Sequence, residues 1–300
     1  MKVVAGIVLF NPDLQRLNEN INAVKNQVEQ IIFFDNGSQN WNEIKKFFKK
    51  NDLENNIKVL RSKNNKGIAY ALNMIAVYAM NNGYEWLLTL DQDTVIKKDL
   101  ITKYSSFTNL KNIGQLSCAY KDRNSNKIYN LISKNKKYSE VKECITSGAL
   151  LNLRALKKIG GFDTDLFIDY VDFELCFALR KMGLKTYAIN YVGMLHEVGH
   201  IKEVKIGQHV SIVLNQSSFR HYYMTRNELI VARRYPNEET LKYALIIQLK
   251  VLGKVILFEN NKFSKVNSIL RGAKDGLTNN YSRSRDYLKE MNYESLCNYS

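Results

Sequence analysis

The sequence predicts an α/β fold, with a mainly parallel sheet flanked by helices and a helical C-terminal extension. Three observations lead to this prediction. Apolar strands alternate with amphipathic helices over the first 95 residues, the first strand is apolar on both faces, and acidic residues follow two of the strands. Such alternation is typical of parallel sheets covered by helices, which bind ligands at the carboxyl ends of their strands.

The first half of the chain has a regular pattern. Residues 3–10 form an unbroken apolar run, as expected for a strand buried on both faces. Leu14, Leu17 and Ile21 then recur at helical spacing. The expected strands span residues 3–10, 31–34, 57–60 and 86–90, and the expected helices span residues 14–28, 41–50 and 67–79.

The second half is less regular, and fewer elements can be predicted in it. The expected elements are a strand over residues 145–153, a turn at Gly160, a helix over 173–182, a strand over 186–189, and helices from about Ser218 onward. We expect His196 to lie in a loop after the strand over 186–189.

Composition and charge limit the class of protein. The 300 residues are 45% hydrophobic and include only two prolines, which fits one or two compact domains without a linker. The formal net charge of +15 suggests an anionic partner, namely nucleic acid, anionic lipid or a phosphorylated substrate; a lysine-rich solvated surface is the alternative. Because no RNA-binding, zinc-finger or helix-turn-helix pattern is present, we do not expect nucleic acid binding.

The cysteines and the N-terminal run point to a protein of the cytosol. None of the four cysteines forms a CxxC pair, which argues against a zinc knuckle or a redox dithiol and fits a reducing compartment. The N-terminal apolar run stops at Asn11 and Pro12, so we interpret it as a strand rather than a signal peptide. No uninterrupted apolar run reaches the roughly 18 residues of a membrane span.

Acidic residues follow two predicted strands. Asp91 and Asp93 come directly after strand 86–90; carboxylates at this spacing in extended chain point the same way and can share a divalent cation. Such a cation would hold a diphosphate and neutralise charge on a leaving nucleotide, whereas a turn or a helix cap is the alternative. Asp35, after strand 31–34, is either a turn residue or a carboxylate that grips a base or ribose.

A third acidic cluster and a histidine pair lie further along the chain. Asp169, Asp172 and Glu174 can cap the predicted helix, or one of them can act as general base beside a substrate hydroxyl. His196 and His200 have the spacing of a zinc-binding helix, but nearby glycines argue against a helix there. We therefore interpret His196 as either a metal or phosphate ligand or a structural histidine.

These motifs occur in a fixed order along the chain. They are the segments 7–12, 34–38, 65–69, 91–93, 146–148 and 167–172, followed by His196 and the segment 222–227. In this order they resemble family 2 glycosyltransferases with the GT-A fold, and the later segments resemble the bacterial rhamnosyltransferase branch of that family. The resemblance covers roughly residues 1–230.

The resemblance implies a domain organisation and a catalytic base. The GT-A catalytic domain would span residues 1–215, with a Rossmann-like nucleotide-sugar half over about 1–95 and an acceptor half over about 96–215. A helical C-terminal region would span 216–300. By analogy the enzyme inverts the anomeric configuration and Asp172 is the catalytic base. The family commonly has Glu-Asp where this chain has Val171-Asp172, so Asp169 and Glu174 are rival candidates.

The resemblance also implies a metal and a donor site. Asp93 and His196 would bind a divalent cation, Mn²⁺ or Mg²⁺. Arg226 would pair with the diphosphate, a task that suits a bidentate guanidinium. The residues implied to bind the nucleotide sugar are Phe10, Asn11, Asp35, Asn65, Gly67, Asp91 and Arg226.

The expected reaction moves a sugar, L-rhamnose from dTDP-rhamnose, to a hydroxyl of a cell-surface polysaccharide or a polyprenyl-diphosphate-linked acceptor. A transferase of the same fold that uses a UDP-hexose donor is the alternative. A nucleotidyltransferase would carry a glycine-rich phosphate loop after the first strand, and residues 11–13 do not form one.

The C-terminal region suggests contact with a membrane surface. Residues 201–300 carry 16 basic and 9 acidic residues, and the apolar segment 241–258 contains three lysines. A basic amphipathic helix can lie on an anionic bilayer. Packing on the catalytic domain or a homodimer contact are alternatives. We therefore expect a cytoplasmic protein, peripheral on the inner face of the cell membrane.

Overall fold

The structure is a computed structural model, which describes residues 1–51, 56–197, 202–206, 209–213, 215–279, 281–283 and 287–288. The chain forms two compact units. The first unit holds Met1–Thr164 and Val171–Glu197, together with the described residues 287–288; the second holds Asp165–Tyr170 and the described part of Val198–Arg283. The domain division expected between residues 215 and 216 stays a prediction.

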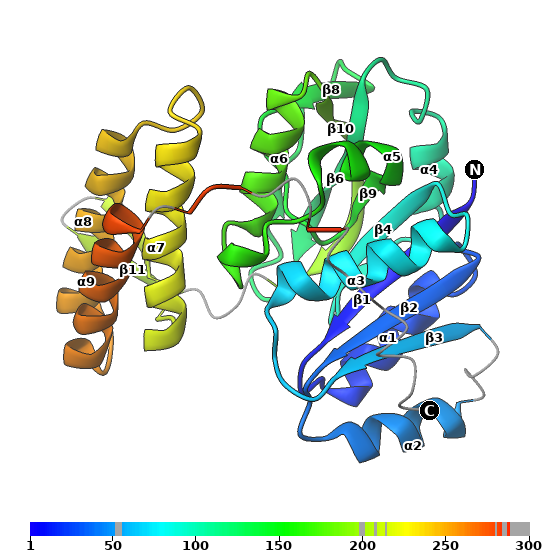
Figure 1. The fold of residues 1–300 in the computed structure, drawn as a ribbon, viewed down its shortest axis with the longest axis horizontal. Coiled ribbons are helices and arrows are strands. Elements are labelled where there is room, and N and C mark those ends of the chain that lie inside the picture. Colours follow the sequence, from blue (N-terminus) through cyan, green and yellow to red (C-terminus); the bar gives the residue numbers. More distant parts are fainter. Residues whose placement is uncertain are drawn as a thin grey trace. The chain divides into compact units, whose positions relative to one another are not determined.

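The first half of the first unit alternates strands and helices, as the sequence predicts. Four parallel strands lie in the order β3-β2-β1-β4, and helix α3 crosses in front of them in Figure 1. The elements are β1 (Val3–Leu9), α1 (Leu14–Val24), β2 (Gln30–Asn36), α2 (Trp41–Lys50), β3 (Ile57–Ser62), α3 (Ile68–Asn81) and β4 (Trp86–Asp91).

Local chemistry explains where these helices begin and what they bury. Asp13 caps α1, because its Oδ1 accepts hydrogen bonds from the backbone N–H groups of Gln15 (2.8 Å) and Arg16 (3.0 Å). Helix α2 turns Ile44 and Phe48 inward and leaves its lysines in water. Helix α3 is apolar nearly all round, and nine of its residues are buried.

The second half of this unit continues the same sheet. Within the described residues the full strand order is β3-β2-β1-β4-β9-β6-β10-β5, with β6 and β10 parallel and β9 antiparallel to both of its neighbours. The remaining elements are β5 (Val95–Ile96), α4 (Leu100–Ser105), β6 (Ile113–Asp122), β7 (Ile128–Tyr129), β8 (Tyr138–Val141), β9 (Ala149–Asn152), α5 (Leu153–Ile159), a 3₁₀ turn (Thr164–Leu166), α6 (Val171–Lys181) and β10 (Lys185–His196).

Two expectations for the second half were wrong in detail. Strand β9 begins at Ala149 rather than at residue 145, because Gly148 has a φ of 77° and ends a turn there. His196 lies at the end of β10 and not in a loop. The strand passes a register irregularity between Ile189 and Val192 and then continues, paired with β5 and β6.

The second unit is largely helical. It contains the hairpin β11 (Lys202–Ile206) and β12 (His209–Val213), followed by α7 (Ser218–Arg234), α8 (Leu241–Phe258) and α9 (Lys262–Thr278). Helix α9 packs closely on α7 at two glycines: a Cβ at Gly272 would lie 2.5 Å from the carbonyl oxygen of Tyr222, and one at Gly276 would lie 2.7 Å from that of Arg226. Among the described residues, no helix combines the length and apolarity needed to cross a bilayer.

The cysteines of the described part of the chain are free thiols. Cys118, Cys144 and Cys176 are buried and unpaired by disulfides. Burial raises the pKa of the Cys118 thiol to about 11. Cys297 and His200 lie outside the described residues.

Candidate active site

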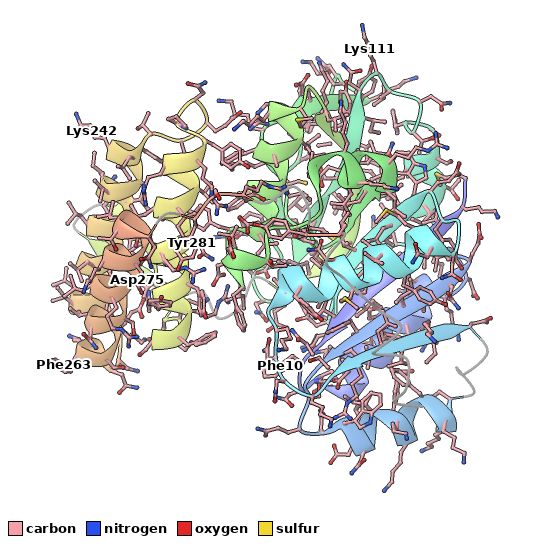
Figure 2. All side chains as sticks on the ribbon, in the orientation of Figure 1. Phe10, Lys111, Lys242, Phe263, Asp275 and Tyr281 are labelled. Carbon is pink, nitrogen blue, oxygen red and sulfur yellow. The ribbon has the colours of Figure 1, made fainter. Side chains whose placement is uncertain are left out.

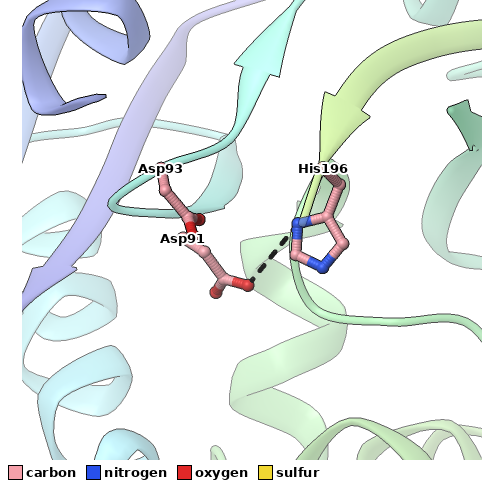
Figure 3. Close-up of side chains that lie close together, drawn as sticks. All are labelled: Asp91, Asp93 and His196. Carbon is pink, nitrogen blue, oxygen red and sulfur yellow. Dashed lines mark ion pairs between the residues drawn. The ribbon is translucent and has the colours of Figure 1, made fainter. Parts of the chain in front are cut away.

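Two carboxylates and a histidine converge at the carboxyl ends of β4 and β10. Potential ligand atoms of Asp91, Asp93 and His196 all lie within 4.8 Å of one another (Figure 3). Asp91 Oδ2 lies 3.9 Å from His196 Nδ1. The short strand β5 explains this meeting, since it sets Val95 opposite Leu195 and so brings the turn after β4 beside the end of β10.

A chain of buried hydroxyl groups connects the members of this cluster. The backbone N–H of Asp91 donates to Ser147 Oγ (3.0 Å), which lies 2.8 Å from Thr94 Oγ1. Thr94 Oγ1 lies 2.9 Å from His196 Nδ1. On the other side, Asn20 Nδ2 donates to the carbonyl oxygen of Asp91 (2.7 Å). The backbone of Asp91 and the imidazole of His196 are therefore held by groups that are themselves enclosed.

Sequence reasoning missed Thr94 and Asn20 and included Ser147 only as part of a motif. Both Thr94 and Ser147 are buried polar residues, and buried hydroxyl groups require partners. A threonine that follows an Asp-x-Asp motif by one position is a weak signal of this role on its own.

The three side chains at the centre suit a hard divalent cation. Carboxylate oxygens and an imidazole nitrogen are ligands that Mn²⁺, Mg²⁺ and similar ions accept. The side chain of Asp91 is 42% exposed and that of His196 is 13% exposed, so an ion can reach the carboxylates while the ring stays fixed. The residues present thus fit a bound cation.

The predicted donor-site residues at the end of β1 tie three strands together. The backbone N–H of Phe10 donates to Gln92 Oε1 (3.0 Å), which connects β1 with the turn after β4. Asn11 has a φ of 48°; its N–H donates to Ser38 Oγ (2.9 Å) and its Oδ1 accepts from the N–H of Gln39 (2.7 Å). The ring of Phe10 is exposed beside this junction.

Asp35 lies at the end of β2 and is fully buried. Its Oδ2 accepts from Arg61 Nε (2.9 Å), and its Oδ1 accepts from the N–H of Ser38 (3.2 Å). The guanidinium of Arg61 lies 4.7 Å from the ring centre of Trp41. The carboxylate of Asp35 is thus already satisfied inside the protein, and its predicted contact with a base or ribose stays a prediction.

Asn65 and Gly67 belong to the loop before α3. Asn65 Oδ1 accepts from Asn36 Nδ2 (3.0 Å) and from the N–H of Gly67 (2.9 Å), while Asn36 Oδ1 accepts from the N–H of Lys66 (2.8 Å). Gly67 has a φ of 87°, which favours glycine at the start of this helix. The loop is thereby fastened to the end of β2, next to Asp35.

The three candidate bases occupy different environments. Asp172 lies in the first turn of α6, is partly exposed, and its Oδ1 accepts from the N–H of Phe173 (3.0 Å). Asp169 forms a two-point ion pair with Arg220, whose Nε lies 3.2 Å from Asp169 Oδ2 and whose Nη2 bonds Oδ1. Glu174 is fully buried.

Arg226 lies in the second unit, on α7, with its guanidinium enclosed. Its Nε donates to Asn227 Oδ1 (2.9 Å), and its Nη2 donates to the carbonyl oxygen of Asp165. The rings of Tyr223 and Tyr281 lie 4.9 Å and 5.3 Å from the guanidinium carbon. The predicted pairing of Arg226 with a diphosphate stays a prediction.

Asn227, the neighbour of Arg226, fastens the segment 165–170. Its Nδ2 lies within hydrogen-bond distance of the carbonyl oxygens of Leu166 (2.6 Å), Ile168 (2.8 Å) and Asp169 (2.9 Å). The segment needs such support, because Phe167, Asp169 and Tyr170 all have φ values between 56° and 64°. Each such residue costs on the order of 1–3 kcal/mol.

Comparison with known proteins assigns the chain to a family. Residues 5–160 match the family model described as Glycosyl transferase family 2. Over 248 residues the chain is 30% identical to the dTDP-rhamnosyl transferase RfbF of Shigella flexneri. The alignment covers 77% of this chain and 80% of that protein. The resemblance to the rhamnosyltransferase branch is therefore confirmed.

Solved structures confirm the fold at much lower sequence identity. The mannosyltransferase PcManGT from Pyrobaculum calidifontis, in complex with GDP-Man and Mn²⁺, is similar with a TM-score of 0.60 and 14% identity, over 92% of this chain and 87% of that one. Residues 1–349 of TarS from S. aureus are similar with a TM-score of 0.56 and 13% identity, over 93% and 81% of the two chains. These likenesses confirm the predicted GT-A fold, and the family match decides the class: the chain belongs to glycosyl transferase family 2 and is a glycosyltransferase.

Proposed function

We propose that this enzyme transfers L-rhamnose from dTDP-rhamnose to a hydroxyl group of a cell-surface polysaccharide or a lipid-linked oligosaccharide, with inversion at the anomeric carbon. The observation that carries the proposal is the cluster of Asp91, Asp93 and His196 at the carboxyl ends of two strands of a family 2 fold. The 30% identity to a dTDP-rhamnosyl transferase supports this donor over a UDP-hexose, which is the alternative.

The cluster supports a divalent cation, Mn²⁺ or Mg²⁺, as the cofactor. Asp93 and His196 would hold the ion, and Asp91 would contribute its partly exposed carboxylate on the nucleotide side. When bound, such an ion neutralises charge on the departing diphosphate. Leaving-group stabilisation of this kind is one of the two requirements for transfer from a nucleotide diphosphate sugar.

The second requirement is a base, and the environments of the three candidates favour Asp172. Asp169 is held in a two-point ion pair with Arg220, so its carboxylate is already occupied by another side chain. Glu174 is fully buried, so its carboxylate has no exposed surface to offer to an acceptor hydroxyl. Asp172 is partly exposed in the first turn of α6 and would take the proton from the attacking hydroxyl.

The remaining donor-site residues support a nucleotide pocket at the ends of β1, β2 and β4. Phe10 presents an exposed ring, and Asn11, Asn65 and Gly67 shape the loops around it through hydrogen bonds to neighbouring strand ends. We further propose that the enzyme works in the cytoplasm, at the inner face of the cell membrane, because a polyprenyl-diphosphate-linked acceptor would be anchored there.

The proposal is tested with a donor panel and two variants. The purified enzyme is incubated with dTDP-rhamnose or UDP-hexoses, an oligosaccharide acceptor and Mn²⁺ or Mg²⁺, and the released nucleoside diphosphate is measured. Asp172→Asn should retain Mn²⁺ binding and lose about 100-fold or more in transfer rate. Asp93→Asn should lose Mn²⁺ binding as well as transfer.

The control variant is Glu43→Gln, at an exposed glutamate in the first turn of α2, which should leave both readouts unchanged. Full transfer by Asp172→Asn would contradict the assignment of the base. Release from a UDP-hexose but not from dTDP-rhamnose would replace the proposed donor, and a product that keeps the donor's anomeric configuration would exclude inversion.

A further inference from the structure

Helix α8 turns a row of large apolar side chains toward the solvent. Leu249 is 67% exposed and Leu257 is 64% exposed. The exposed apolar residues of this helix, which we call the α8 stripe, are Leu245, Ile246, Leu249, Ile256 and Leu257. Their spacings of 4, 7 and 11 residues place them on one side of the helix.

The opposite side of α8 is occupied by its own unit. Ala244 packs with Leu229 and Ala232 of α7, and Gln248 Oε1 accepts from Thr225 (2.7 Å). The most exposed members of the α8 stripe, Leu249 and Leu257, therefore lie outside the core of the helical unit. A contiguous exposed apolar surface of this kind usually marks a binding surface.

The next helix adds a second exposed row. Phe263 is 90% exposed at the start of α9, and Leu270 and Leu277 follow it at intervals of seven residues. Figure 2 shows the side chains of Phe263 and Lys242 on the outside of this unit, pointing away from its helices. Both helices thus present apolar side chains to the surroundings in addition to those that pack against α7.

The charges around these rows select the partner. Helix α8 carries Lys242, Lys250 and Lys254 and no acidic residue. On α9 the acidic residue Asp275 is already engaged, since its Oδ2 accepts from the hydroxyl of Tyr222 (2.6 Å). A second copy of this chain would bring lysines against lysines. A surface that combines apolar side chains with positive charge is complementary to an anionic lipid surface.

We infer that α8 and α9 form a surface that binds an anionic bilayer. The α8 stripe and Phe263 enter the boundary between headgroups and acyl chains, and the lysines contact anionic headgroups. Because this surface lies in the second unit, and the proposed base and metal ligands lie in the first, the inference does not depend on the proposed reaction.

The test is sedimentation of the full-length protein with vesicles. We expect binding to vesicles that contain phosphatidylglycerol, weaker binding to phosphatidylcholine vesicles, and release at high salt, since the headgroup attraction is screened. Leu249→Gln and Leu257→Gln should each lower the partition coefficient about tenfold, as expected for one large apolar side chain withheld from the bilayer.

Two further variants protect the test against misfolding and nonspecific loss. Phe263→Ser alters a side chain that is almost entirely exposed, so weaker binding by this variant cannot come from a damaged core. Ile128→Gln, at an exposed isoleucine of β7 in the first unit, is the matched control and should bind like the wild type.

The outcomes separate the partners. Equal binding of wild type, Leu249→Gln and Phe263→Ser would overturn the inference, as would the absence of binding to either vesicle. A concentration-dependent dimer that Leu249→Gln dissociates, seen by light scattering without vesicle binding, would assign the same surface to a second copy of the chain.

Discussion

Thr94 gives the sharpest test of how the candidate metal site is held. Its hydroxyl lies 2.8 Å from Ser147 Oγ and 2.9 Å from His196 Nδ1, and the residue is fully buried. In Thr94→Val a methyl group of similar size replaces the hydroxyl, so the packing is kept and both hydrogen bonds are lost. We predict that the variant folds and binds Mn²⁺ more weakly than the wild type.

The size of the effect follows from the lost contacts. A buried polar group without a partner costs about 1–3 kcal/mol, and here the imidazole of His196 loses the group that fixes its ring and its tautomer. Because 1.4 kcal/mol corresponds to a tenfold change, the expected loss in Mn²⁺ affinity is about 10- to 100-fold. Ser147 still accepts from the N–H of Asp91, so the turn after β4 should remain in place.

The assay is a Mn²⁺ titration followed by electron paramagnetic resonance, with nitrogen-15 NMR of the His196 ring in the metal-free protein. Thr94→Ser is the control, since it keeps the hydroxyl and should retain affinity within about threefold, the usual spread of such contributions. Wild-type affinity and an unchanged ring spectrum in Thr94→Val would refute the reasoning. Equal losses in both variants would also contradict the reasoning, since Thr94→Ser keeps the hydroxyl that is meant to hold the ring.

Three other predictions concern stability and the donor site. Burial and the nearby Glu239 raise the pKa of Glu228 to about 7 from 4.5, so the folded state holds this proton more tightly and stability falls as pH rises between about 4.5 and 7. Glu228→Gln should therefore raise the free energy of unfolding by up to about 3 kcal/mol above pH 7 and by much less near pH 4.5. The measurement is a denaturant titration at each pH, and a gain that does not depend on pH would count against this explanation. In Arg226→Lys the lysine cannot make both hydrogen bonds of the guanidinium, so thermal melts should show a loss of stability of about 1–3 kcal/mol. A higher KM for the donor with unchanged stability would instead support the diphosphate role. Gly37→Ala should lower stability by more than Gly83→Ala. Both glycines have a positive φ, but of the two only Gly37 would bring a Cβ close to backbone, 2.8 Å from the carbonyl carbon of Asn64. Equal melting temperatures of the two variants would contradict this argument.

The first half of the fold was predictable because its signals are local. Apolar runs and helical spacing mark each element between residues 3 and 91, and α2 has the bounds that the sequence predicts. Strands β1, β2 and β4 are buried along nearly their whole length, so a continuous apolar run is a sufficient signal for them.

The second half depends on contacts that a local pattern does not contain. Strand β6 holds the buried polar residues Gln115 and Ser117, which interrupt any apolar run. Gln115 Nε2 donates to Thr186 Oγ1 (3.0 Å), a residue 71 positions away, so the polarity is satisfied only after the sheet has formed. The continuation of β10 to His196 likewise depends on β5 and β6 rather than on its own sequence.

The candidate site shows the same division. The carboxylates of Asp91 and Asp93 after a predicted strand were sufficient to suggest a metal site, and the family resemblance added His196 to it. The sequence could not indicate that Thr94 joins His196, because the two lie 102 positions apart and meet only when β5 pairs with β10. Residue type suggests candidate ligands, whereas the groups that hold those side chains in place follow from topology.

The segment 222–227 extends this distinction to a family motif. Its Arg226 was expected to serve the donor, yet the side chains of Arg226 and Asn227 bind carbonyl oxygens of segment 165–170 inside the second unit. That segment contains three residues in the left-handed region, a conformation that side-chain hydrogen bonds must stabilise if it is to persist. In sequence it leads directly into α6, whose first turn carries Asp172. The motif thus stabilises a strained backbone segment that lies just before the proposed base in the sequence. Such a motif can serve catalysis without touching the substrate. Stability and donor KM, measured together for Arg226→Lys, decide between the two roles.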